Sequence, residues 1–154
     1  MLSVTAANRA DIRVVEALVH DLKAIPEHVR EKAAEALGEL GDSRAVTALV
    51  EALLSDESVY VRERAAYALG RLGDGRASEP LIQALRDQSE YVRREVVQAL
   101  GKLGYYRVVE PLIEAILQDE SASVRERAAE VVETLIEALK RIRRQYVHEA
   151  VEGA

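Results

Sequence analysis

A fifteen-residue stretch that recurs along the chain constrains its fold more than any other feature. Residues 60–74 read YVRERAAYALGRLGD, and related copies occupy 28–42 (HVREKAAEALGELGD), 91–105 (YVRREVVQALGKLGY) and, in shortened form, 123–135 (SVRERAAEVVETL). The valine at the second position of each copy lies at 29, 61, 92 and 124, in steps of 32, 31 and 32 residues. A fixed period in this range is typical of stacked helical repeats. The sequence therefore predicts an all-α solenoid.

Each repeat is predicted to contain two helices. The short first helices are expected at 45–54, 77–86 and 108–117, and polar links (SDES, DQSE, QDES) join each to the recurring stretch that forms the second helix. One side of the stretch is apolar at helical spacing, which predicts a buried face. Its members are Val61, Ala65, Leu69 and Leu72, widened by Ala66 and Ala68.

Glycine is expected to end the second helices, and aspartate is expected to cap the helices that follow. Gly41-Asp42 and Gly73-Asp74 follow second helices, where glycine suits a left-handed C-terminal residue and aspartate caps what comes next. Gly38, Gly70 and Gly101 are read in the same way, as helix-ending positions. Residues 1–10 carry no copy of the repeat and are treated as a lead-in, with Asp11 as the N-cap of the first helix.

The pattern V-R-x-x-A-A-x-A-L-G-x-L-G-D, followed by A-V-x-P-L-I-x-A-L, resembles the HEAT-like repeat of the phycobilisome-lyase type and is similar to the artificial alphaRep scaffolds. The resemblance covers about residues 11–135. It implies a right-handed α-solenoid of about four helix pairs, whose second helices line a concave binding surface. The whole chain, 1–154, is then one domain with a lead-in (1–10), repeats (about 11–135) and a C-terminal helical extension (136–152).

Composition narrows the classes of partner and location. A net charge of −6 argues against general nucleic-acid binding and against an anionic membrane surface. No apolar run approaches the roughly 20 residues of a membrane span, and no signal peptide is visible at the start. Cysteine is absent, which excludes disulfides and thiolate metal sites. We therefore expect a cytoplasmic protein that binds neither nucleic acid nor membrane.

The polar side of the recurring stretch differs from copy to copy, as expected of a display surface on a repeat scaffold. In the two middle repeats it gathers tyrosines and cations, residue types enriched at protein interfaces. We predict that this surface binds a protein or peptide and that its cations steer acidic segments; alternatively, the tyrosines only cover alanine-rich gaps. The predicted partner-binding residues are Tyr60, Arg64, Tyr67, Arg71, Tyr91, Arg94, Gln98 and Lys102, with Glu63 and Glu95 beside them.

Residues that recur in every copy are interpreted as structural. The repeated arginines (Arg30, Arg62, Arg93, Arg125) and link acids (Asp56, Asp87, Asp119) predict a ladder of inter-repeat ion pairs rather than anion sites. The deoxyhypusine hydroxylases, one branch of HEAT-like proteins, bind two irons through His-Glu pairs, whereas the one such pair here is His148-Glu149. No nucleophile–base arrangement and no glycine-rich phosphate loop is apparent. We expect no catalytic residue, no metal and no cofactor.

The last copy lacks the helix-ending glycines, so its helix is predicted to run from about residue 123 to 152, roughly 45 Å. An apolar stripe with 4-3-4 spacing continues along it at Leu135, Leu139, Ile142 and Tyr146. We predict that this stripe is an oligomer contact, buried against a second copy in a homodimer or against a partner; the alternative is a solvated cap. Tyr105-Tyr106 replaces the polar turn residues of the other repeats, and either a contact edge or packing on a neighbouring helix would explain it.

These observations favour a non-enzymatic interaction scaffold or adaptor that binds its partner on the concave face. A bilin lyase or lyase subunit is the alternative by family analogy, and an engineered repeat scaffold is a third interpretation.

Overall fold

The computed structural model describes residues 6–104 and 106–152, and all regular structure within them is helical. Four helix pairs follow one another along the chain, and a short 3₁₀ turn precedes the first helix of each later pair. The α-helices are α1 (Ala6–Asp21), α2 (Glu27–Leu40), α3 (Val46–Ser55), α4 (Val59–Leu72), α5 (Ser78–Ala84), α6 (Glu90–Leu103), α7 (Val109–Gln118) and α8 (Ala122–Glu152). The 3₁₀ turns are η1 (Ser43–Ala45), η2 (Gly75–Ala77) and η3 (Tyr106–Val108).

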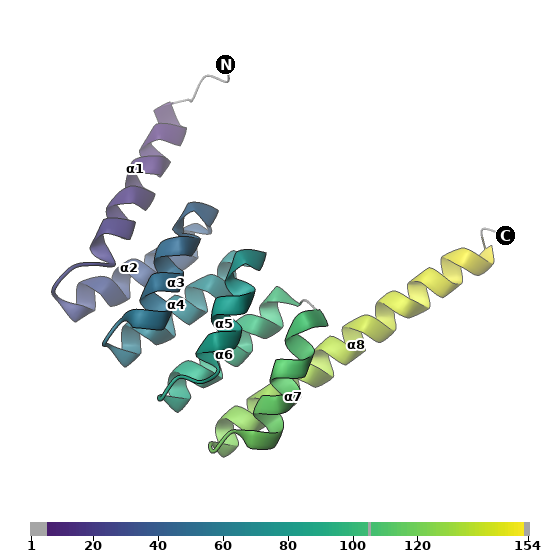
Figure 1. Cartoon of the computed structure of the whole chain (residues 1–154). Helices are drawn as coiled ribbons and strands as arrows, with labels where there is room; N and C mark the ends of the chain where they lie inside the picture. The colour runs from purple at the N-terminus through teal and green to yellow at the C-terminus, as the bar shows by residue number, and fades with distance from the viewer. Residues whose placement is uncertain (1–5, 105, 153–154) are drawn as a thin grey trace.

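The helices form two layers. Figure 1 shows α1, α3, α5 and α7 in one row and α2, α4, α6 and α8 in another, with each second helix beside the next. One continuous core lies between the layers and includes Leu37, Leu49, Leu69, Leu81, Leu100 and Leu112, all fully buried. The predicted buried face of α4 is confirmed, because every member except the half-buried Leu72 is inaccessible to solvent. The all-α solenoid is therefore confirmed.

The predicted caps lie where the sequence places them. Gly41, Gly73 and Gly104 follow α2, α4 and α6 with φ between 63° and 69°, the left-handed conformation that glycine adopts without strain. Asp74 then caps η2 by accepting a hydrogen bond from the backbone N–H of Arg76 at 2.9 Å. Hydrogen bonds from the Arg76 side chain and backbone hold the pKa of Asp74 at about 2.

Three other glycines do not end helices, which corrects the sequence interpretation. Gly38, Gly70 and Gly101 lie within the last turn of α2, α4 and α6, two residues before the final residue of each helix. A Cβ at Gly70 would lie 2.8 Å from the Cα of Ala99, and one at Gly38 would lie 2.8 Å from the Cα of Ala68. Glycine is needed there because neighbouring second helices cross at close range.

The step of 31 residues between Val61 and Val92 arises from a shorter α5. Between the 3₁₀ turn and the link aspartate, the repeat that contains α5 is one residue shorter than its neighbours, and α5 ends at Ala84 after seven residues. The helices α3 and α7 have ten residues each. The missing residue thus shortens a first helix and leaves the second-helix layer in register.

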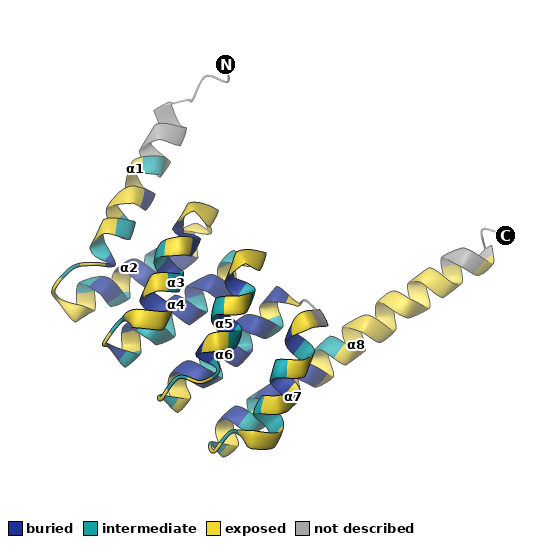
Figure 2. Cartoon of the chain, viewed as in Figure 1, coloured by how far each residue is buried: buried dark blue, intermediate teal, exposed yellow. Residues whose placement is uncertain are grey.

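The first and last helices differ from the inner ones. The helix α1 begins at Ala6, so Asp11 lies within it and the predicted N-cap at Asp11 is wrong. The helix α8 matches its predicted bounds and extends well past the stack, where Figure 2 colours its described residues as exposed. Leu135 is half-buried against the core, whereas all residues from 136 to 148 are exposed.

Candidate protein-binding surface

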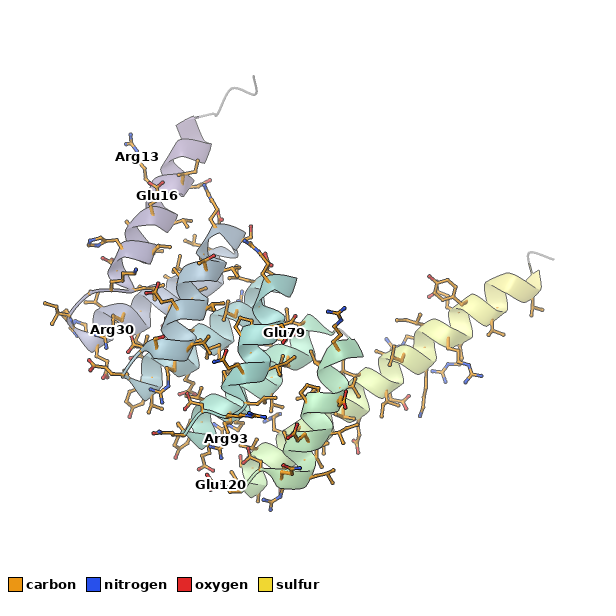
Figure 3. The ribbon with its side chains drawn as sticks, in the orientation of Figure 1. Arg13, Glu16, Arg30, Glu79, Arg93 and Glu120 are labelled. Carbon is orange, nitrogen blue, oxygen red and sulfur yellow. The ribbon has the colours of Figure 1, made fainter. Side chains whose placement is uncertain are left out.

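The repeated arginines form the predicted ladder along the edge of the stack where the links lie. Arg93 donates from Nε and Nη2 to the two carboxylate oxygens of Asp119 in the next repeat, at 2.8 and 3.0 Å. Its Nη1 donates to two carbonyls of its own link, those of Asp87 and Gln88. Arg30 binds Asp56 and Arg62 binds Asp87 in the same way, and Figure 3 labels two of these arginines, Arg30 and Arg93.

Burial makes this ladder structural. The side chains of Arg93 and Asp119 are each 7% exposed, and the hydrogen bond to Asp119 raises the pKa of Arg93 against the opposing effect of burial. A bidentate guanidinium–carboxylate pair satisfies both charges where water is scarce. The predicted inter-repeat ion pairs are confirmed for Arg30, Arg62 and Arg93, whereas Arg125 makes only the link hydrogen bonds among the described residues.

The candidate surface is the second-helix face, which we define as the side of α2, α4, α6 and α8 opposite the first-helix layer. The eight predicted partner-binding residues form two parallel stripes on it. Tyr60, Arg64, Tyr67 and Arg71 come from α4, and Tyr91, Arg94, Gln98 and Lys102 come from α6. Because α4 and α6 are adjacent, the structure places the two stripes side by side.

Tyr67 is the centre of a cluster on this face in which two cations contact one aromatic ring. The Arg71 guanidinium lies 5.9 Å from the ring centroid, and the Lys102 Nζ lies 5.0 Å from it, reaching across from α6. Arg71 also donates from Nη1 to the Tyr67 hydroxyl at 3.4 Å and from Nε to the Gly38 carbonyl at 3.3 Å. Two cations thus hold one aromatic ring in place, a cation–π arrangement that fixes the ring before any partner arrives.

The other two tyrosines are exposed at the starts of their helices. Tyr60 is 60% exposed and Tyr91 is 54% exposed, so neither buries itself in the gap between helices. The Arg94 guanidinium lies 5.8 Å from the centroid of the Tyr91 ring. Arg64 forms an ion pair with Glu31 of α2 at 3.5 Å and is therefore less available to a partner than Arg94.

Glu95 belongs to this surface in a way that the sequence does not reveal. Its Oε1 is buried and has no hydrogen-bond partner among the described residues. Burial raises the pKa of Glu95, Lys102 opposes the shift, and the like charge of Glu63 adds to it. An unsatisfied buried acceptor is costly, so this carboxylate destabilises the folded state when it is ionised.

A groove of about 320 Å³ extends the surface towards α8. Gln98 and Lys102 line it from α6, and Glu130, Val131, Thr134 and Leu135 line it from α8. Val131 occupies the repeat position of Ala68 and Ala99, the residues that Gly38 and Gly70 approach. A Cβ at Gly101 would lie 2.6 Å from the Cγ1 of Val131. Of the eight predicted residues, only Gln98 and Lys102 line this groove.

The predicted oligomer contact is divided between core and solvent. Leu135 packs against the core, while Leu139, Ile142 and Tyr146 are 53%, 51% and 71% exposed. Lys140 pairs with Glu137 at 2.8 Å on the same helix. The exposed stripe therefore begins beyond Leu135. Of the Tyr105-Tyr106 turn, Tyr105 and the side chain of Tyr106 lie outside the described residues.

Within residues 6–104 and 106–152, no group of three or more His, Asp or Glu side chains is placed to hold a metal ion. In the same part of the chain, no helix is long and apolar enough to cross a membrane.

Two layers of paired helices joined by an arginine–aspartate ladder define a helical-repeat solenoid. The family model of HEAT repeats matches residues 5–69, 46–133 and 78–152, so the chain belongs to the HEAT-repeat family. No curated protein matches the chain in sequence.

Solved structures with the same fold include an enzyme, a complex of two proteins and an engineered protein. Human deoxyhypusine hydroxylase in complex with glycerol is 28% identical, with a TM-score of 0.76 over 88% of this chain and 48% of that one. The complex of CpcE and CpcF of phycocyanin lyase from Nostoc sp. PCC7120 is 26% identical, with a TM-score of 0.69 over 84% of this chain and 56% of that one. An engineered protein, 22% identical with a TM-score of 0.60 over 85% of this chain and 66% of that one, shares the fold. The chain thus spans about half the length of the first two.

Proposed function

We propose that the chain is a non-enzymatic interaction scaffold that binds a protein or peptide on the second-helix face of α4 and α6. The observation that carries this proposal is the Tyr67 cluster, in which Arg71 and Lys102 hold an aromatic ring on the second-helix face. Aromatic and arginine anchors dominate the energetics of most protein interfaces. A ring already held in place loses little side-chain entropy on binding.

Charge supports an acidic segment as the ligand. The two stripes carry Arg64, Arg71, Arg94 and Lys102 against Glu63 and Glu95, an excess of two positive charges in a chain whose net charge is −6. Complementary charge steers encounter and fixes register more than it adds affinity.

The experiment begins with a display library of random twelve-residue peptides selected against the full chain. A selected peptide is labelled, and its affinity for the wild type and for Tyr67→Ala is measured by fluorescence anisotropy. We expect Tyr67→Ala to weaken binding roughly thirty-fold, the equivalent of about 2 kcal/mol for an interface anchor. Tyr146→Ala is the matched control, because it removes an exposed tyrosine from the extension. Equal affinities for wild type and Tyr67→Ala would contradict the proposal.

The lyase alternative rests on likeness to the CpcE–CpcF complex. Mixing the chain with a bilin and recording the absorbance spectrum tests it, and a spectral shift that saturates at one equivalent would favour it over the scaffold. The cytoplasmic location expected from the sequence stays a prediction.

The exposed stripe of Leu139, Ile142 and Tyr146 supports a second proposal, that two copies pair through their extensions. Burying these three side chains against a second copy would remove apolar surface from water along about two helical turns. Light scattering over a concentration series tests this. A monomer at every concentration, unchanged by Leu139→Glu with Ile142→Glu, would show that the extension is a solvated cap.

A further inference from the structure

The arginine ladder has a fourth guanidinium that is held like the other three. Arg125 donates from Nη1 to the carbonyls of Asp119 and Glu120, at 2.7 and 3.1 Å. These are the same two link positions that Arg93 uses in its own repeat, at 2.8 and 3.3 Å. The backbone therefore orients the Arg125 side chain as it orients the inner rungs.

The fourth guanidinium differs from the other three in the partner of its Nε and Nη2 edge. In Arg30, Arg62 and Arg93, the Nε and Nη2 edge donates to an aspartate of the following repeat at 2.8 to 3.1 Å. For Arg125, no carboxylate of the described residues accepts from that edge. Three occupied examples in the same chain show which ligand this geometry takes, namely a carboxylate bound in bidentate fashion.

The last repeat also leaves an apolar side chain of its first helix exposed. Ile113 of α7 is 43% exposed, whereas Val50 and Ile82, at the same position of the preceding first helices, are half-buried. We call the α7–α8 side of the last repeat, which carries Arg125, Ile113 and Glu133, the end face.

We infer that the end face binds a helix pair of a partner protein whose inter-helix link places an aspartate against Arg125. Each inner link also uses its aspartate to accept from the N–H of the serine two residues later, at 2.8 to 2.9 Å. The partner link that fits is therefore of the Asp-x-Ser type. This surface is separate from the second-helix face, so the inference stands independently of the proposed function.

A second copy of this chain does not fit the end face as well as such a partner. The link aspartate lies five residues before the repeat valine, and the first repeat has Ala24 at that position. Glu133 occupies the repeat position of Gly38, Gly70 and Gly101, where the next second helix approaches closely. In a head-to-tail stack it would contact Ala36 of the second copy. Head-to-tail stacking of identical chains would thus leave Arg125 without an acid and press a carboxylate against alanine.

Supplying the missing groups in the chain itself tests this inference. The variant Ala24→Asp with Glu133→Gly restores both the acid and the close approach, and we expect it to self-associate head to tail in sedimentation velocity. Ala24→Asn with Glu133→Gly is the matched control, which keeps shape but lacks the carboxylate. We expect its dissociation constant to be higher by on the order of tenfold or more.

Adding Arg125→Gln to the Ala24→Asp variant should abolish the difference, and circular dichroism should show that all variants keep their helix content. Equal association of the Asp and Asn variants, or none by either, would overturn the inference. Pairing through the α8 extensions would affect both variants alike, so it does not mimic the expected result.

Discussion

Replacing Arg93 with glutamine is expected to destabilise the fold far more than the same substitution at Arg125. The side chains of Arg93 and Asp119 are each 7% exposed, so Arg93→Gln strands a buried carboxylate. Breaking a buried ion pair by removing one partner costs roughly 3–5 kcal/mol. Arg125→Gln removes only two hydrogen bonds to link carbonyls, a loss of about 1–2 kcal/mol. Arg93→Gln loses the equivalent pair of carbonyl contacts as well, so the two variants should differ by the ion-pair cost alone, about 3–5 kcal/mol.

Urea denaturation of the two variants and the wild type, followed by circular dichroism, gives the free energies of unfolding. Both substitutions are chemically identical and both remove the same pair of link contacts, so their difference isolates the carboxylate. Equal losses would refute the reasoning, because they would show that the bidentate pairs contribute no more than the carbonyl contacts do.

Two further predictions concern close packing and titration. Gly101→Ala should destabilise the fold by about 1–2 kcal/mol, because crowding against Val131 outweighs the helix propensity gained. Adding Val131→Ala should recover part of this loss. A double-mutant cycle that shows no coupling between the two positions would contradict the prediction. Glu95→Gln should raise stability at neutral pH, because the raised pKa of Glu95 means that its ionised form disfavours the folded state. That gain should disappear as the pH falls below about 4, where the carboxyl is protonated in both states, and a gain independent of pH would point to a cause other than ionisation.

The sequence predicted the features that depend on repetition. The period of the repeat valines located all four second helices, and the identity of Arg30, Arg62, Arg93 and Arg125 marked them as structural. Helical spacing then separated the buried face of α4 from the stripe that carries Tyr67. These inferences succeed because each repeat makes the same contacts with its neighbour, so a role in one copy holds in the others.

Features set by contacts between copies could not be predicted. The glycine of each second helix was read as a helix end, because its neighbour Ala68 or Ala99 comes from a different repeat. The unpartnered oxygen of Glu95 depends on how α4 and α6 are packed, and a single stretch of sequence shows only that an acid is present. The early start of α1 at Ala6 has a local cause, since residues 6–10 (AANRA) include strong helix formers and need no cap at Asp11.

Binding of a partner to the second-helix face around Tyr67 is tested most directly by nuclear magnetic resonance mapping, with the ¹⁵N-labelled chain titrated with a peptide selected from the random library. We expect the largest shifts of backbone amides on α4 and α6, around Tyr67, Glu95 and Lys102. Shifts centred instead on residues 139–151 of the extension, or on the first-helix layer, would contradict it.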